Sequence, residues 1–364
     1  MDFLADVASC FRLDGAMENI QAIEAGHIND TYLVETSSAR RYVLQRINHQ
    51  VFRDPRGLMR NVELVTQHIK QKLEATGEQD AGRRVLSVVP TMDDEPLCQW
   101  SDGTFWRVFP YVARTHTVGV EATLEETYQA GLGFGQFVAQ LVDLPASELC
   151  ETISKFHHGP SRLEAFQQAV ADDVAGRAGE CQEEIATVQQ YAELLTTPQQ
   201  LIDSGELPLR VTHNDTKCNN ILLDDQSSAA VCVIDLDTVM PGLAMWDIGD
   251  LVRTSACRAP EDETDLSLVK VESERLLEAA RGYLQGCGGL LTDRELRSLA
   301  GGPSYMALIM ATRFLTDFLA GDTYYKTLHP GHNLDRCRNQ LALLAELENQ
   351  RPVLERLFAE ATSS

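Results

Sequence analysis

VTHNDTKCNNILL, residues 211–223, is followed after a polar turn by VCVIDLD, residues 231–237. Both stretches contain apolar runs rich in β-branched side chains, which predicts two buried strands joined as a hairpin. Asp215 lies two residues after a His, Asn220 lies five residues further on, and Asp235 ends the second strand. This spacing is typical of a loop that catalyses phosphoryl transfer and of the metal-binding Asp that follows it.

Each polar residue in this segment suits one task of phosphoryl transfer, which depends on positioning and charge stabilisation more than on covalent help from the protein. Asp215 can accept the proton of an acceptor hydroxyl, and Lys217 would face the γ-phosphate. Asn220 and Asp235 supply a neutral and an anionic oxygen, the hard ligands that Mg²⁺ prefers. His213 lies next to the strand, away from the acceptor, so we expect it to hold the loop by hydrogen bonds.

The alternative is that these residues form ordinary polar turns beside two buried strands, because Asn and Asp bond their own backbone in turns. Four polar residues at fixed offsets, followed by an Asp at the end of the hairpin, favour the catalytic interpretation. Cys218 lies inside the loop, but no neighbouring base is in place to activate it. Asp247, a short loop further on, either braces the catalytic loop through its backbone amides or only caps the helix that begins there.

The charge of the chain disfavours two classes of partner. Its 31 Lys and Arg residues against 54 Asp and Glu residues give a formal net charge of -23, and the pI is near 4.7. A surface of this charge repels nucleic acid and anionic membranes, so neither is expected as a partner. At 364 residues and 44% hydrophobic content, the chain can bury a large core and is expected to form two lobes.

The N-terminus and the cysteines bear on location. Residues 1–6, MDFLAD, show no basic segment before an apolar one, and no apolar run approaches the ~20 residues needed to span a bilayer. We therefore expect a cytoplasmic protein. Nine cysteines are scattered singly without a Cys-x-x-Cys pair, which argues against a disulfide framework and against structural zinc.

Predicted strands come first along the chain and predicted helices after them. The strands are expected at 22–24, 31–35, 41–47, 85–90 and 104–111, with a polar loop at 77–84, and the longer helices at 56–73, 124–141, 162–178, 182–195, 269–284, 293–299, 303–319 and 333–357. Gly131 and Gly133 are expected to permit close helix packing. This order predicts an α+β fold with a small antiparallel-sheet lobe, 1–112, and a larger, mainly helical lobe, 113–364, with the catalytic hairpin in the cleft between them.

Two further segments are candidates for nucleotide and substrate contacts. Gly26, between two predicted strands, can lay backbone N–H groups over phosphates, and His27 beside it is a candidate substrate contact. A plain hairpin turn would look the same. Pro110, Tyr111 and Val112 are expected to form the hinge between the lobes, where an extended backbone can read an adenine edge.

Six segments of the chain together resemble the phosphotransferase family that contains aminoglycoside phosphotransferases and choline kinases, whose fold is protein-kinase-like. They are residues 26–32, 60–65, 210–220, 234–241, 313–315 and 332–334. The segment 210–220 alone identifies the wider family, whereas the flanking segments resemble its N-acetylhexosamine 1-kinases. This resemblance implies ATP-dependent phosphorylation of the anomeric hydroxyl of N-acetylglucosamine or N-acetylgalactosamine, with Mg²⁺ as cofactor and Asp215 as base.

The resemblance also implies contacts to the sugar and one departure from the family. Arg313 and Tyr324 would face the sugar; alternatively, Arg313 pairs with Asp317 one turn later and Tyr324 is a packing residue. The strand at 41–47 lacks the Lys that contacts the α- and β-phosphates in the wider family and has Gln45 at that position. The contact to these phosphates therefore stays unassigned.

Three other functions remain open from the sequence. A kinase of another small hydroxyl compound, such as choline, homoserine or an aminoglycoside, would use the same loop, and the acidic pI would suit a cationic substrate. A protein kinase is disfavoured because no Asp-Phe-Gly or Ala-Pro-Glu segment surrounds Asp235. A non-catalytic nucleotide-binding module is disfavoured because the candidate base and both candidate metal ligands are present.

Overall fold

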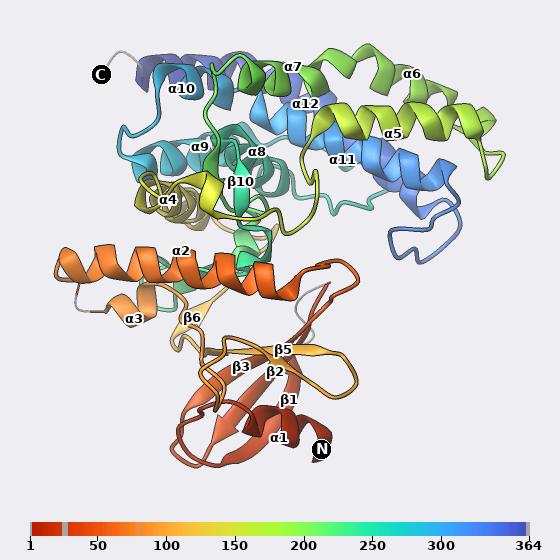
Figure 1. The fold of residues 1–364 in the computed structure, drawn as a ribbon. Helices are drawn as coiled ribbons and strands as arrows, with labels where there is room; N and C mark the ends of the chain where they lie inside the picture. Colours follow the sequence, from red (N-terminus) through yellow and green to blue (C-terminus); the bar gives the residue numbers. More distant parts are fainter. Residues whose placement is uncertain (1, 24–27, 79, 362–364) are drawn as a thin grey trace.

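The chain folds into two lobes of unequal size (Figure 1). The computed structural model describes residues 2–23, 28–78 and 80–361. A small antiparallel sheet forms the core of one lobe and a larger set of helices forms the other, with helix α2 lying between them. The α+β class and the two-lobed architecture are therefore confirmed, whereas the boundary between residues 112 and 113 stays a prediction.

The small lobe is built on a five-stranded antiparallel sheet in the order β1-β2-β3-β5-β4. Its strands are β1 (Met17–Ile23), β2 (Asp30–Thr36), β3 (Arg41–Ile47), β4 (Cys98–Gln99) and β5 (Phe105–Pro110). Helix α1 (Asp2–Ser9) covers one face through an apolar cluster that includes Val7, Leu44 and Trp106. The opposite face, which carries Ile47 and Phe109, packs toward α2 and the larger lobe.

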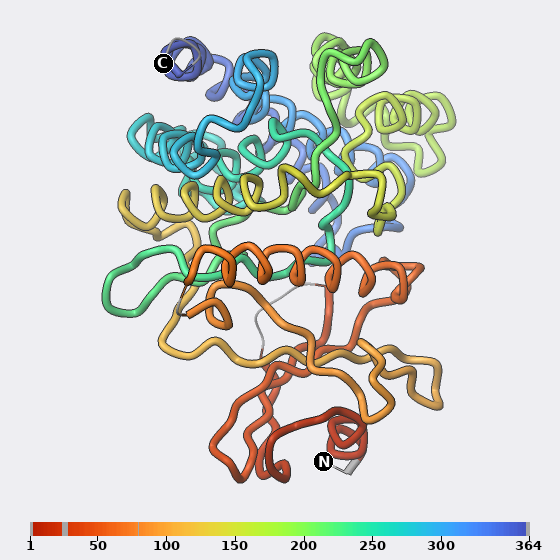
Figure 2. The backbone as a smooth tube through the Cα atoms, turned by 60° about the vertical axis from the view of Figure 1, so that its left-hand side comes forward, coloured from red at the N-terminus to blue at the C-terminus, as the bar shows by residue number. Residues whose placement is uncertain are grey.

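Helix α2 (Pro55–Ala75) joins the two lobes (Figure 1, Figure 2). It begins where the Asp54 side chain accepts a hydrogen bond from the Gly57 N–H at 2.9 Å, with Pro55 in the first turn. Its buried apolar side chains pack in one cluster with residues of both lobes. Asn61 adds a polar anchor, because its amide group donates to backbone carbonyls of the larger lobe, those of Cys150 at 2.8 Å and Val239 at 3.0 Å. A short helix, α3 (Ala81–Arg84), follows.

The large lobe contains most of the helices. They are α4 (Leu124–Gln140), α5 (Gly159–Asp172), α6 (Gln182–Gln190), α7 (Ala192–Asp203), α8 (Ala244–Ser255), α9 (Ser273–Cys287), α10 (Asp293–Leu299), α11 (Gly302–Leu319) and α12 (His332–Ala361), with single 3-10 turns at Ala146–Glu148, Ala178–Glu180 and Leu266–Leu268. Their apolar faces form one extended core. In the described ranges, none of the helices is long and apolar enough to cross a membrane.

Helices α4 and α9 pack so closely that their backbones are in contact, and glycine residues make this approach possible. A Cβ atom on Gly131 would lie 2.3 Å from the Ala279 carbonyl oxygen, and one on Gly282 would lie 2.1 Å from the Tyr128 carbonyl oxygen. The expected close packing is therefore correct for Gly131. Gly133 instead faces Ile221, at the start of the catalytic hairpin. Helix α4 thus connects the helical core to the hairpin.

Five short strands carry the catalytic segment. β7 (Arg210–Thr212) pairs with β10 (Met240–Gly242), while β8 (Ile221–Asp224) and β9 (Ala230–Val233) form the predicted hairpin, to which β6 (Thr115–His116) adds a third strand. Two single 3-10 turns, Cys218–Asn220 and Leu236–Thr238, precede and follow this hairpin. The chain therefore passes twice between these two small sheets, from β7 to β8 through Asp215 and from β9 to β10 through Asp235.

Two element predictions were wrong in the small lobe. Residues 85–90 form no strand, although Val89 donates its N–H to the Val108 carbonyl of β5 at 2.9 Å. The single bond does not extend into a ladder because the chain leaves the sheet at once, toward Arg12, whose N–H donates to Pro90. The polar segment expected as a loop at 77–84 contains α3.

Three helix predictions for the large lobe had wrong limits. The helix expected at 162–178 ends at Asp172, because Asp173 takes a left-handed conformation with φ of 37°. The helix expected at 182–195 is two helices that meet at Tyr191. The helix expected from 269 begins at Ser273, because Val271 is held in an isolated β-bridge to Cys257.

Candidate active site

Two residues of the candidate site have left-handed backbone conformations. The φ angles are 63° at Asn214 and 59° at Asp235. Such conformations cost a non-glycine residue about 1–3 kcal/mol and persist where surrounding contacts impose them. The Asn214 side chain donates to the Thr238 carbonyl at 3.0 Å, which ties the turn around Asp215 to the turn that follows Asp235.

Asp247, in the first turn of α8, holds the catalytic loop by hydrogen bonds. Its carboxylate accepts the N–H groups of His213 at 3.0 Å and Asn214 at 2.8 Å, and the Thr216 hydroxyl donates to its backbone carbonyl. Burial raises the pKa of Asp247 to about 6, while the hydrogen bonds from the loop favour its charged form. The expected bracing role of Asp247 is therefore confirmed by its contacts.

His213 is fully buried and uses both ring nitrogens. Nε2 lies 2.9 Å from the Ile234 carbonyl oxygen, and Nδ1 accepts the Asp215 N–H at 3.3 Å. The imidazole must then carry its proton on Nε2. With Phe134 and Phe137 packed against the ring at 5.4 and 5.9 Å, His213 has no free nitrogen for proton transfer. These contacts agree with the expected structural role.

Asp215, the carboxylate expected to act as base, lies beside a cation. The Lys217 ammonium is 3.2 Å from Asp215 Oδ2, and the Asn220 amide donates to the same oxygen at 3.1 Å. Burial alone would raise the pKa of Asp215, but the charge and hydrogen bond of Lys217, together with smaller effects of His213 and Arg253, offset it and hold this pKa below its usual value. Asp215 is therefore ionised at neutral pH and 24% exposed, so it can accept a proton from a bound hydroxyl.

Asn220 and Asp235 fit a divalent cation by their chemistry. Because the Asn220 nitrogen is engaged with Asp215, its carbonyl oxygen Oδ1 is the atom left to meet a metal. Asp235 is solvent-exposed, yet partial desolvation by the protein around it and the nearby Asp237 and Asp215 carboxylates raise its pKa to about 7. In the part of the chain that the structure describes, no cluster of three His, Cys, Asp or Glu side chains forms a complete metal cage. Mg²⁺ commonly takes only one or two protein carboxylates and completes its shell with water and nucleotide phosphates.

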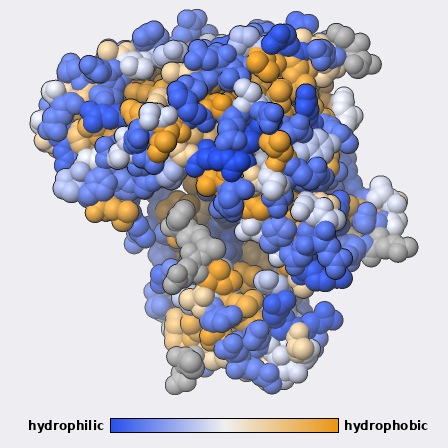
Figure 3. Space-filling model, turned by 180° about the vertical axis from the view of Figure 1, so that it is seen from behind, coloured by the Kyte–Doolittle hydropathy of each residue, from blue (hydrophilic) through white to orange (hydrophobic). Residues whose placement is uncertain are grey.

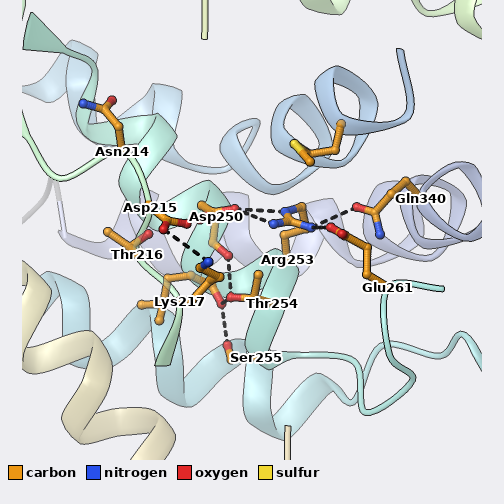
Figure 4. Close-up of polar contacts among 12 residues, drawn as sticks. Asn214, Asp215, Thr216, Lys217, Asp250, Arg253, Thr254, Ser255, Glu261 and Gln340 are labelled. Atoms are coloured by element: carbon orange, nitrogen blue, oxygen red, sulfur yellow. Dashed lines mark hydrogen bonds and ion pairs between the residues drawn. The ribbon is translucent and has the colours of Figure 1, made fainter. Parts of the chain in front are cut away.

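A second carboxylate, not predicted from the sequence, faces Lys217 from α8 (Figure 4). Asp250 is buried, and its negative charge adds to that of Asp215 in raising the pKa of Lys217. Arg253 holds Asp250 at 2.9 Å and also contacts Glu261 at 3.0 Å and Gln340 of α12 at 3.1 Å. The signal in the sequence is the spacing: Asp250 lies three residues after Asp247 on the same helix.

The surface is hollowed between the two lobes (Figure 3). The residues expected to form the hinge, 110–112, lie at the end of β5 and just after it. The Tyr111 N–H donates to the Arg41 carbonyl at 3.0 Å, and the Arg41 guanidinium lies 4.1 Å from the centre of the Tyr111 ring. The Val112 carbonyl accepts the Thr115 hydroxyl at 2.8 Å. Part of the hinge backbone expected for an adenine is thus already bonded within the protein. The nucleotide role of Pro110, Tyr111 and Val112 stays a prediction.

Arg313 and Tyr324 line a cavity of about 210 Å³ between α5, α11 and the loop after α11. The alternative pairing of Arg313 with Asp317 is wrong, because the Asp317 carboxylate accepts the N–H groups of residues 323–325 at 2.8–2.9 Å. The Arg313 guanidinium lies instead over the rings of Phe156 and Tyr325, at 5.2 and 5.6 Å. The two residues come together as expected, but their contact with a sugar stays a prediction.

His157 lies between this cavity and the catalytic loop. Its Nε2 is 2.9 Å from the Asn214 carbonyl oxygen, and burial lowers its pKa to about 3, so the ring is neutral and donates this hydrogen bond. The charges of Arg313, Asp215 and Arg162 all act on the ring. The His157 ring is therefore close to both the cavity and the candidate base, Asp215. Neither His157 nor Arg162 was recognised in the sequence, since His157 lies in the loop before α5 and Arg162 is a single arginine in the first turns of that helix, with no motif around either.

Two predicted site residues cannot be placed. Gly26 and His27 lie outside the described residues. Asn29, just after them, contacts the turn that follows Asp235: its amide group donates to Asp237 Oδ2 at 2.7 Å. The loop between β1 and β2 therefore ends beside the candidate metal site.

Comparisons with known proteins agree with this arrangement. The model of the phosphotransferase enzyme family, APH, matches residues 19–283. An aminoglycoside phosphotransferase from Alicyclobacillus acidocaldarius is 14% identical, with 98% of this chain and 96% of that chain covered and a TM-score of 0.61. Amicoumacin kinase, solved in complex with AMP-PNP, Ca²⁺ and Ami, is 13% identical, with coverages of 96% and 92% and a TM-score of 0.61. An ethanolamine kinase from Plasmodium vivax is 12% identical, with coverages of 89% and 82% and a TM-score of 0.54. Identities this low establish a shared fold only.

Proposed function

Because the chain belongs to the phosphotransferase enzyme family, we propose that it is an ATP-dependent kinase of a small hydroxyl compound, with Mg²⁺ as its metal. The observation that carries this proposal is the contact of Asp215 with Lys217 and Asn220, in a loop whose backbone is held by Asp247 of α8. An ATP analogue and a divalent cation are bound by the amicoumacin kinase of similar fold, which supports the same cofactors here.

The contacts support one proposed role for each side chain. Asp215 accepts the proton of the acceptor hydroxyl as its oxygen attacks the γ-phosphorus. Lys217, held by Asp215 and Asp250, offsets negative charge on the transferring phosphoryl group. Asn220 and Asp235 would hold Mg²⁺, which when bound neutralises phosphate charge. His213 keeps the loop in place and exchanges no proton with the acceptor.

For the acceptor, we propose the anomeric hydroxyl of an N-acetylhexosamine. Besides the resemblance of the flanking segments, the cavity beside His157 supports this choice through its charge. Arg162 and Arg313 both line it, and Arg162 Nε is buried without a partner. Guanidinium groups donate to hydroxyl and acetamide oxygens and repel a cationic acceptor. The one carboxylate of the lining, that of Asp317, is occupied by backbone N–H groups.

A kinase of a cationic acceptor is the second candidate. The net charge of -23 favours it, and the ethanolamine kinase and aminoglycoside phosphotransferase of similar fold are named for amine-bearing acceptors. The local charge of the cavity opposes it. We give the local charge more weight, because an exposed charge more than a Debye length of about 8 Å away is screened by salt.

An ADP-release screen decides between the two. N-acetylglucosamine, N-acetylgalactosamine, the corresponding plain hexoses, choline, ethanolamine, homoserine and an aminoglycoside are each offered with ATP and Mg²⁺. We expect turnover with the N-acetylhexosamines and none above background with the cationic compounds. Turnover confined to a cationic compound would reject the sugar and retain the kinase. No turnover with any acceptor, together with no stabilisation by Mg·ADP, would reject the kinase itself.

The position of the new phosphate is tested on the product. A phosphate on the anomeric oxygen is lost in mild acid, because its departure leaves an oxocarbenium ion, whereas a 6-phosphate ester survives the same treatment. We therefore expect an acid-labile product that no longer reduces alkaline copper. An acid-stable product, or one that still reduces copper, would exclude the anomeric position.

A further inference from the structure

The small lobe supplies a cation to the cleft from a strand other than the expected one. Gln45 on β3 stands directly opposite Arg107 on β5, so the two side chains share one face of the sheet. Gln45 Oε1 accepts the Arg107 Nε–H at 3.0 Å, and Gln45 Nε2 donates to the Thr31 hydroxyl at 3.1 Å. The uncharged residue at the usual lysine position thus orients an arginine on the neighbouring strand.

Arg107 crosses the cleft to the segment that carries Asp235. Its Nη1 lies 2.5 Å from Asp237 Oδ1, and the two side chains are 1% and 3% exposed. The other oxygen of Asp237 accepts the Asn29 amide at 2.7 Å. Both oxygens of this carboxylate are therefore held by side chains of the small lobe. Removing either charged partner would leave the other buried and unpaired, which is strongly unfavourable.

Asp237 is well placed to control Asp235. Both belong to the turn after β9, where Asp235 has the left-handed backbone and residues 236–238 form a single 3-10 turn. The turn is held before Asp235 by Ile234, whose N–H donates to the Asn220 carbonyl at 2.9 Å, and after it by Asp237 through Arg107, which leaves the intervening backbone little freedom. The direction of the Asp235 carboxylate then depends on a contact made by the opposite lobe.

We propose that Arg107 is a positioning residue for nucleotide-bound metal: through Asp237 it fixes the Asp235 turn, and so couples the small lobe to the metal site without a lysine on β3. The inference rests on the proposed function, because it takes Asp235 as a metal ligand. With Nε on Gln45 and Nη1 on Asp237, Arg107 acts in this proposal through Asp237 and not as a direct contact of the metal or the phosphates. Partners that orient a metal ligand commonly contribute about 10–100-fold to metal affinity or activity.

The test uses three variants: Arg107→Gln, Asp237→Asn and the double variant that combines these two substitutions. Arg46→Gln serves as the control. Arg46 is the matched control: it follows Gln45 on β3 and pairs with Asp30, but both side chains are about half exposed. Calorimetry measures ADP binding with and without Mg²⁺, and kinetics gives the Mg²⁺ activation constant and both KM values. We expect each single variant to weaken Mg²⁺-dependent ADP binding about 10–100-fold and to raise the activation constant by a similar factor. Metal-free ADP binding and the acceptor KM should change by less than about 3-fold, and the control should behave like the parent.

The double variant separates a shared role from two independent ones. If Arg107 acts through Asp237, the double variant should be no weaker than the weaker single variant, because contacting residues are not additive. Additive losses, or a loss of metal-free ADP binding in Arg107→Gln alone, would instead make Arg107 a direct phosphate contact and overturn the proposal. Parental Mg²⁺ dependence in a folded Asp237→Asn variant would also overturn it.

Two further variants keep the test decisive. Arg107→Lys retains the charge without the forked donors, so we expect a Mg²⁺ activation constant between those of the parent and Arg107→Gln. Arg107→Lys takes the place of Arg107→Gln if the latter does not fold. In that case, parental behaviour of both Arg107→Lys and Asp237→Asn overturns the proposal. Asp235→Asn tests the premise. If it leaves Mg²⁺-dependent ADP binding intact, the proposed metal site is wrong. If it abolishes this binding while the Arg107 and Asp237 variants do not, only the present inference is wrong.

Discussion

The proposed active site contains two loops, the catalytic loop and the loop after α11. A buried aspartate holds each of them, in different surroundings. Asp247, in the first turn of α8, accepts two backbone N–H groups of the catalytic loop. Asp317, near the end of α11, accepts the N–H groups of residues 323–325. The catalytic loop is also buried at its side chains, among them Asn214, whereas Tyr324 is 62% exposed.

The difference separates the chemistry from the choice of acceptor. In the catalytic loop both backbone and side chains are fixed, so the direction of Asp215 is set before any ligand binds. In the loop held by Asp317 the backbone is fixed and Tyr325 packs on Phe314, but Tyr324 faces the cavity and solvent and can adapt to an acceptor. Changes at the two loops should therefore affect different kinetic constants.

The largest effect is expected from the reactive side chain of the fixed loop. Asp215→Asn should lower kcat by at least ~100-fold, because it removes the base while preserving shape. Binding of Mg·ADP, followed by thermal shift, should persist. Asp225→Asn, at an exposed carboxylate in the turn between β8 and β9, is the control and should keep parental kcat. Near-parental kcat in Asp215→Asn would remove Asp215 from the mechanism.

Arg313→Ala should act on the acceptor instead. Losing hydrogen bonds from a charged donor costs roughly 1.5–3 kcal/mol, so kcat/KM for the acceptor should fall by about 10–150-fold while the KM for ATP stays unchanged. Arg336→Ala, which removes an arginine stacked on Phe314 nearby, provides the comparison for lost packing. Equal shifts in the ATP and acceptor constants, with lower thermal stability, would make Arg313 a structural residue.

Asp247→Asn tests the anchor of the catalytic loop. The amide keeps one acceptor oxygen but turns an NH₂ group toward a backbone N–H, so one buried donor loses its partner. We expect the free energy of unfolding in urea to fall by about 1–3 kcal/mol. The kcat should fall as well, since the Asp215 turn loosens. An unchanged kcat at reduced stability would show that the brace serves folding alone.

Asp317→Asn should have the smallest effect. The loop it holds is partly solvated, so water can satisfy a released N–H, and we expect a loss of about 0.5–1.5 kcal/mol in unfolding free energy. The KM for the acceptor should rise several-fold while kcat stays within about 2-fold of the parent. If Asp317→Asn lowers kcat as much as Asp247→Asn does, the two loops do not divide the work as proposed.

The sequence was most informative where the chemistry is local. Asp215, Lys217 and Asn220 lie within six residues, so fixed spacing alone brings them together on one turn. The same holds for the two-lobed fold, because strands and helices are segregated along the chain. The structural role of His213 also followed from its place beside the strand, whereas the place of Asp247 at a helix start left bracing and capping both open.

Contacts between distant segments were not predictable in this way. Arg107 and Asp237 are separated by 130 residues, and no periodic pattern links a strand residue to a turn in the other lobe. The pairing of Arg313 with Asp317 failed for the opposite reason. The i,i+4 spacing was suitable, but a loop further along the chain supplied N–H groups that occupy the carboxylate. Local rules propose partners, and tertiary contacts select among them.

The anchoring of α2 has a consequence for motion. Asn61 bonds α2 to two backbone carbonyls of the large lobe, and the apolar side of the helix is packed into a cluster that extends to Phe137 and Val231. The sheet and α1 would then move together as one rigid body that opens and closes over nucleotide. Helix α2 would stay with the large lobe and provide the surface against which the sheet moves. Ile47 and Phe109 would slide across that surface, in a shear rather than a hinge. Amide hydrogen exchange should accordingly protect α2 to the same degree as α4, with and without bound nucleotide.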